Sequence, residues 1–137
     1  MLERGLEILV RTVPEEIFGP GWVLRAQQLG LNSGRIDLLF ADSEGNLNLV
    51  ELKKGRASLG AVDQVLRYAE DLNAVADAPV VPWVLAQDIP KSARVKAESL
   101  GVRVKSLPMD ECDELIRSKG IEKTRVRSSE SEPTAVF

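Results

Sequence analysis

Periodic and alternating apolar positions divide the chain into short helices and strands. Apolar residues at helical spacing over residues 2–13 predict a first helix that Pro14 closes, and similar stripes predict helices over 58–76, 90–100 and 109–119. Runs rich in leucine, valine and isoleucine predict strands over 22–30, 34–41, 47–53, 78–86 and 102–107. Residues 42–46 combine Asp, Ser, Gly and Asn, which is typical of a hairpin turn between the second and third strands.

The predicted element order is α-β-β-β-α-β-α-β-α. An antiparallel meander of three strands, followed by two strands that each come after a helix, indicates an α/β fold with one mixed sheet. A chain of 137 residues has the usual length of one domain, so we predict a single domain over residues 1–119. From residue 120 the apolar periodicity is lost, and residues 120–137 are expected to be a flexible or partner-ordered tail.

Three charges stand inside the predicted second and third strands. Asp37 interrupts the second strand, and Glu51 and Lys53 interrupt the third. Side chains two residues apart share a strand face, and the hairpin brings Asp37 beside Glu51. Neighbouring carboxylates repel each other unless they share a cation, and Mg²⁺ or Mn²⁺ with water molecules suits such oxygen ligands. The alternative is a structural ion pair of Lys53 with Glu51 or Asp37 at a sheet rim.

The composition narrows the possible chemistry. The chain has no histidine, which excludes Ser-His-Asp triads and His-based zinc sites. Its single cysteine, Cys112, excludes an intramolecular disulfide and fits a reducing compartment, so we expect a cytoplasmic protein. No apolar run reaches the roughly 18 residues that a membrane span needs, so no membrane association is expected. The net charge of −3 gives no overall attraction to nucleic acid.

A second polar group lies on the helix predicted after the third strand. Gln64 and Tyr68 are four residues apart and share one helix face, although a solvated face with a half-buried tyrosine explains this pair equally well. Taken together, Asp37, "ELK" at 51–53 and Gln64-x-x-x-Tyr68 resemble the PD-(D/E)xK nuclease superfamily, in its RecB-like branch. The stretch from "GRIDLL" at 34–39 to residue 72 resembles more closely the catalytic domain of the NucS/EndoMS-type endonucleases, and the resemblance covers residues from about 7 to 106.

The resemblance implies a restriction-endonuclease-like core and a DNA endonuclease that hydrolyses phosphodiester bonds with Mg²⁺ or Mn²⁺. It implies that Asp37 and Glu51 are metal ligands and that Lys53 is the catalytic base. Such an enzyme would act in DNA repair, recombination or the processing of structured DNA. The remaining alternatives are a Holliday-junction resolvase-like dimer and a non-catalytic DNA-binding or assembly module that keeps the nuclease fold.

The resemblance also assigns roles outside these three residues. Gln64 and Tyr68 would position the metal or the phosphate. The family carries a metal-binding glutamate on its first helix, and "LEILVRTVPEE" matches that helix with Glu7, in preference to Glu3. A separate N-terminal DNA-binding domain, which the NucS/EndoMS-type enzymes have, is not expected in this chain.

Basic residues near the motif would form the DNA-binding surface despite the negative net charge. Besides Lys53, these are Arg35, Lys54, Arg56 and Arg67, although a solvated turn over 53–56 remains an alternative. Trp22 and Trp83 stand in predicted strands and are expected in the core rather than stacked on bases. A homodimer, the commonest symmetric assembly, is also expected.

Overall fold

The computed structural model describes residues 3–121, and the predicted tail beyond residue 121 lies outside the described residues. The element order confirms the expected α/β succession, with one additional short helix. The elements are α1 (Glu3–Thr12), α2 (Pro14–Ile17), β1 (Val23–Leu31), β2 (Gly34–Ala41), β3 (Leu47–Arg56), α3 (Leu59–Asn73), β4 (Val80–Asp88), α4 (Lys91–Ser99), β5 (Arg103–Ser106) and α5 (Met109–Ser118).

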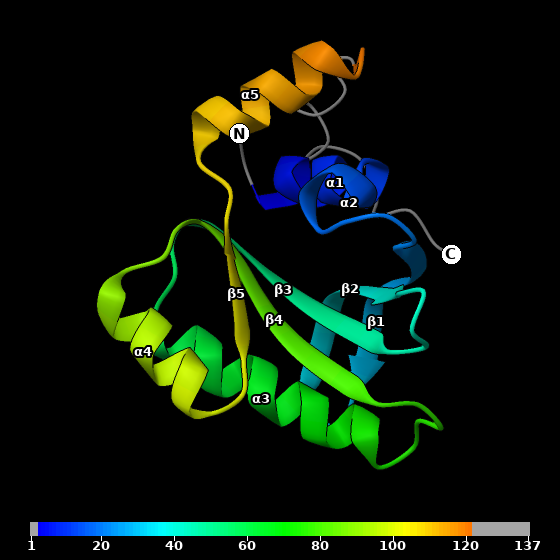
Figure 1. Cartoon of the computed structure of the whole chain (residues 1–137). Helices are drawn as coiled ribbons and strands as arrows, with labels where there is room; N and C mark the ends of the chain where they lie inside the picture. The colour runs from blue at the N-terminus through cyan, green and yellow to red at the C-terminus, as the bar shows by residue number, and fades with distance from the viewer. Residues whose placement is uncertain (1–2, 122–137) are drawn as a thin grey trace.

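The five strands form one mixed sheet in the order β1-β2-β3-β4-β5. The first three strands pair antiparallel, whereas β4 and β5 are parallel additions after α3 and α4. Helices α3 and α4 cover one face of the sheet, and α1, α2 and α5 lie on the other side (Figure 1). This arrangement confirms the mixed, helix-flanked sheet that the apolar pattern predicts.

Two apolar cores follow from the two covered faces. The α3-side cluster packs the sheet against α3 and α4, and includes Ile36, Leu39, Leu49, Val62, Val65 and Val84. The α1-side cluster packs the opposite face against α1, α2 and α5, and includes Leu6, Leu9, Leu38, Phe40, Val50 and Leu52. In β3, Leu49 belongs to the first cluster and Val50 and Leu52 to the second, as strand alternation requires.

Most element boundaries lie within three residues of the predicted ones, and two of the differences involve Pro14 and the end of β3. Pro14 follows the end of α1 but also begins α2, because a proline is well tolerated in the first turn of a helix. Strand β3 continues past Lys53 to Arg56, with a register shift against β4 between these two residues. Ser58 caps the N-terminus of α3 by accepting a hydrogen bond from the Ala61 backbone N–H at 3.1 Å.

The two tryptophans pack against the α1-side cluster, as expected, although both are only partly buried and Trp22 lies just before β1 rather than in it. Trp22 stacks on Phe18 with ring centroids 4.2 Å apart, and Trp83 contacts both rings edge-on. This aromatic group packs against the α1-side cluster, which also contains the buried Cys112. Among the described residues, no helix is both long and apolar enough to cross a membrane.

Candidate active site

Strands β2 and β3 separate at the position of the charged residues. The ladder between them reaches Leu38 and Val50, one residue short of Asp37 and Glu51. Asp37 fills the gap, because its Oδ2 accepts a hydrogen bond of 2.8 Å from the backbone N–H of Leu52. The start of β2 and the middle of β3 therefore diverge around a carboxylate rather than around an apolar side chain.

Asp37 and Glu51 are neighbours in this gap, and each changes the pKa of the other. The side chain of Glu51 is buried, with 5% of its surface exposed. Burial and then the charge of Asp37 raise the pKa of Glu51 from its ordinary 4.5 to about 9. The pKa of Asp37 is also raised, chiefly by burial. Burial and the neighbouring carboxyl group therefore favour the protonated form of Glu51 over its charged form.

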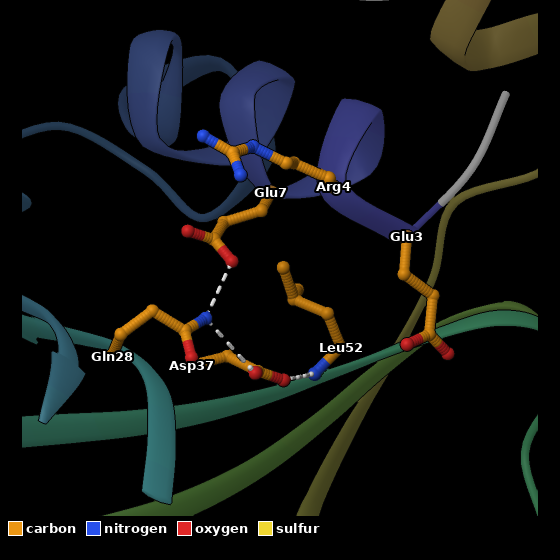
Figure 2. A pocket seen from close by; sticks show the side chains of 6 residues that line it. All are labelled: Glu3, Arg4, Glu7, Gln28, Asp37 and Leu52. Carbon is orange, nitrogen blue, oxygen red and sulfur yellow. Dashed lines mark hydrogen bonds between the residues drawn. The ribbon is translucent and has the colours of Figure 1, made fainter. Parts of the chain in front are cut away.

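A cavity of about 280 Å³ opens beside this pair, under α1. Figure 2 shows its lining residues, which are Glu3, Arg4, Glu7, Gln28, Asp37 and Leu52. Glu7 is buried, with 8% of its surface exposed, and this burial raises its pKa. Its Oε1 accepts a hydrogen bond of 2.7 Å from Gln28 Nε2, and the same nitrogen lies 3.5 Å from Asp37 Oδ1.

The two acidic residues of the first turns of α1 occupy different parts of the cavity. Glu7 reaches toward Gln28 and Asp37, whereas Glu3 lies on the opposite side of the cavity from Gln28 (Figure 2). Glu3 is exposed and its Oε1 accepts a long hydrogen bond, 3.3 Å, from the Lys54 backbone N–H. The geometry therefore favours Glu7 over Glu3 as the acid of the first helix that belongs with Asp37.

The carboxylates of the site fit a hard divalent cation in their chemistry. Glu51 Oε1 is buried and has no hydrogen-bond partner among the described residues, so a ligand oxygen is available. Mg²⁺ and Mn²⁺ prefer such oxygens and complete their shells with water. In the described part of the chain, no three Cys, Asp or Glu side chains lie close enough together to hold a metal. The Gln28 amide lies between the third carboxylate, Glu7, and Asp37.

Lys53 is half-buried on the face of β3 that also carries Glu51. Its charge lowers the pKa of Glu51, but this effect is smaller than those of burial and of Asp37. None of the four salt bridges between described residues involves Lys53. The alternative of a structural ion pair is therefore not found, and the ammonium group remains available for another partner.

The predicted Gln64–Tyr68 pair is formed, and it supports the start of β2. Gln64 Nε2 donates a hydrogen bond of 2.6 Å to the phenol oxygen of Tyr68, which is a buried residue. The Tyr68 ring lies against Gly34, so a Cβ at Gly34 would come within 2.5 Å of the phenol oxygen. Gly34 also has a φ of +149°. The contacts described for this pair fix the segment leading to Asp37 but do not reach Asp37 or Glu51 themselves.

The expected DNA-binding residues lie on the surface. Arg35, Lys54 and Arg67 are exposed. Arg56 is exposed too, but it forms a salt bridge of 2.9 Å with Asp88, which compensates its charge. Of the predicted DNA-binding residues, the ones without a salt bridge to a described residue are Arg35, Lys54 and Arg67.

Three site features were not predicted from the sequence. Gln28 and Arg4 line the cavity, and the Leu52 backbone N–H holds Asp37. Arg4 precedes Glu7 by three residues, so helical periodicity could have placed it beside Glu7. No sequence pattern places Gln28 in the cavity. Strand alternation puts Gln27 and Gln28 on opposite faces of the sheet, so it does not predict that Gln28 also faces α1.

The chain is similar to known endonucleases. The family described as "Endonuclease NucS C-terminal domain" matches residues 3–127. Endonuclease NucS from Corynebacterium diphtheriae is 34% identical over 113 residues, which are 82% of this chain and 46% of that protein.

Three solved structures share the fold. A repair endonuclease from Pyrococcus abyssi matches with a TM-score of 0.72 at 24% identity. The match covers 79% of this chain and 47% of the repair endonuclease. EndoMS, in an EndoMS–dsDNA complex, has a TM-score of 0.69 at 28% identity and covers 79% of this chain and 46% of its own. Together with the MspJI restriction endonuclease, which has a TM-score of 0.60 at 15% identity over 97% of this chain and 33% of its own, these likenesses confirm the restriction-endonuclease-like fold. The chain spans less than half the length of each of these four proteins.

Proposed function

Because this chain belongs to the family of NucS endonuclease C-terminal domains, we propose that it is a metal-dependent DNA endonuclease that hydrolyses phosphodiester bonds. The observation that carries the proposal is the pair of the half-buried Asp37 and the buried Glu51, which stands where β2 and β3 diverge. Removing two adjacent carboxyl groups from water costs free energy, and a cation bound between them would offset that cost. The EndoMS relative, which was solved with double-stranded DNA, supports DNA as the substrate.

In this proposal Asp37, Glu51 and Glu7 hold Mg²⁺ or Mn²⁺. The bound ion would stabilise the negative charge that develops on the phosphate and lower the pKa of a coordinated water. Lys53, on the same strand face as Glu51, would hold the attacking water or the scissile phosphate and act as the base. As a base, Lys53 would take the proton of the attacking water in its neutral form, and in its charged form it would instead stabilise the negative charge that develops on the phosphate.

The remaining residues would bind and orient the DNA. Gln64 and Tyr68 would position the metal or the phosphate, and the packing of the Tyr68 ring against Gly34 supports this by fixing the start of β2. The exposed basic residues Arg35, Lys54 and Arg67, with Arg56, would contact phosphates along the backbone. A homodimer would bring two such sites to one DNA duplex.

The experiment is a cleavage assay on plain duplex, mismatched, branched and single-stranded DNA, with Mg²⁺ or Mn²⁺. Lys53→Ala should abolish cleavage while leaving thermal melting and most DNA affinity intact, because one phosphate contact among several contributes little to binding. Lys91→Ala, at an exposed lysine on α4, is the matched control and should cut at the wild-type rate. Asp37→Asn should remove Mn²⁺ binding in calorimetry.

Two results would contradict the proposal. Undiminished cleavage by Lys53→Ala would remove the catalytic assignment of Lys53. If the wild-type protein binds DNA but cuts none of the four substrates with either ion, a non-catalytic binding module would be the better account of the fold.

A further inference from the structure

Gln28 has a backbone conformation that is unusual for its residue type. Its φ is +52°, and it is the only non-glycine residue in the described part of the chain with a positive φ. Side chains with a Cβ rarely occupy this left-handed region, and glutamine lacks the short polar side chain that helps asparagine and aspartate to do so. Such conformations persist where the surrounding structure determines them, and they concentrate at functional sites.

The left-handed backbone places the Gln28 side chain in the cavity. Successive strand residues normally point to opposite faces, yet Gln27 accepts a hydrogen bond from Arg11 of α1 and Gln28 donates one to Glu7 of the same helix. The pairing of β1 with β2 passes from Gln27–Leu38 to Leu29–Ile36, so Gln28 stands opposite Asp37. Both neighbouring glutamines therefore face α1, and the second one reaches the acidic site.

The Gln28 amide nitrogen lies between two carboxylates. It is 2.7 Å from Glu7 Oε1 and 3.5 Å from Asp37 Oδ1. Figure 2 draws both contacts as dashed lines. A group that donates hydrogen bonds toward two carboxylates at once has the position that a shared cation would take. Amide N–H groups cannot ligate a cation, so the same nitrogen cannot remain there when a metal is bound.

We infer that Gln28 is a positioning residue that bridges Glu7 and Asp37 in the metal-free protein and must turn away when a divalent cation binds. This inference rests on the proposed metal-dependent function and adds the residue that holds its third carboxylate in place. The bridge keeps Glu7 close to the site before the metal arrives. Because its hydrogen bonds must be broken first, it also weakens the apparent affinity for the metal.

The test is calorimetric titration of the full chain with Mn²⁺. Gln28→Met keeps the length of the side chain but removes its donors, and should bind Mn²⁺ about tenfold more tightly, the factor expected when a competing hydrogen bond to a charged group is lost. In EDTA the same variant should melt at a lower temperature than the wild type, because Glu7 and Asp37 lose their bridge.

Gln87→Met is the matched control. Gln87 is also a half-buried strand glutamine, but its side chain accepts a hydrogen bond from the Gly55 backbone N–H instead of bridging carboxylates. Its Mn²⁺ affinity should equal that of the wild type. Gln28→Glu is a second variant at the bridge, which keeps the side-chain size, cannot donate when ionised, and should also bind Mn²⁺ more tightly than the wild type.

The outcomes separate this inference from the function on which it rests. If the wild type binds Mn²⁺ and Gln28→Met binds it equally or more weakly, the inference is overturned, because Gln28 is then a spectator or a ligand through its oxygen. If Gln28→Met does not fold, equal or weaker binding by Gln28→Glu overturns it instead. If the wild type binds no Mn²⁺ at all, the metal-dependent function fails together with the inference.

Discussion

Glu51→Gln tests the electrostatics of the carboxyl pair without involving DNA. The folded, metal-free protein keeps a proton on Glu51 up to a pKa of about 9, whereas the unfolded chain releases it near the ordinary value of 4.5. Between these two values the folded state binds one more proton than the unfolded state. The stabilisation is therefore complete below pH 4.5 and is lost progressively as the pH rises toward 9.

The size of the effect follows from the same two values. Each pH unit between them changes the free energy of unfolding by about 1.4 kcal/mol, so raising the pH from 4.5 to 7 costs about 3 kcal/mol. A glutamine keeps the shape of the protonated acid, can donate to Asp37 and has no proton to lose. We therefore expect Glu51→Gln to be more stable than the wild type at pH 7 by about 3 kcal/mol, which raises Tm by about 10 °C.

The assay is denaturant unfolding in EDTA at several pH values between 5 and 8. The wild type should lose stability across this range, and Glu51→Gln should show a markedly flatter profile. Glu98→Gln, at an exposed glutamate on α4, is the control and should follow the wild type within about 0.5 kcal/mol. Parallel profiles for the wild type and Glu51→Gln would refute the reasoning, because Glu51 would then be ionised in the folded protein.

Two further predictions concern packing and assembly. Gly34→Ala should destabilise the protein by about 2–3 kcal/mol, because the new Cβ would meet the Tyr68 phenol. Gly30→Ala is the control and should change the stability little, because a Cβ at Gly30 would meet no atom within 4 Å. Equal melting temperatures of the two variants would contradict this account. Light scattering should give twice the 15.0 kDa mass of one chain, and a strictly monomeric mass with and without DNA would refute the expected homodimer.

The fold could be predicted from the sequence because the apolar pattern extends over whole helices and strands. Each predicted helix repeats its apolar stripe over two or more turns, and each predicted strand is an apolar run between turn residues, so a misplaced end changes little. The errors fall at boundaries, where single residues decide. Pro14 is compatible with both the end of one helix and the start of another, and the extension of β3 to Arg56 depends on its pairing with β4.

The carboxyl pair was predictable for a similar reason. Strand alternation and one hairpin are enough to bring Asp37 near Glu51, and both are local features of the sequence. Glu7 is different, since its place beside the pair depends on how α1 packs across the sheet. Only the family resemblance suggested it, and the contacts now distinguish it from Glu3.

Gln28 marks the limit of this reasoning. A left-handed backbone conformation in a strand is usually occupied by glycine, asparagine or aspartate, and position 28 is a glutamine. The alternation rule then assigns Gln27 and Gln28 to opposite faces, whereas both contact α1. The contacts that accompany this conformation are tertiary, because Gln28 bridges two acids that come from separate elements. A local sequence pattern cannot predict these contacts, because neither Glu7 nor Asp37 is adjacent to Gln28 in the chain.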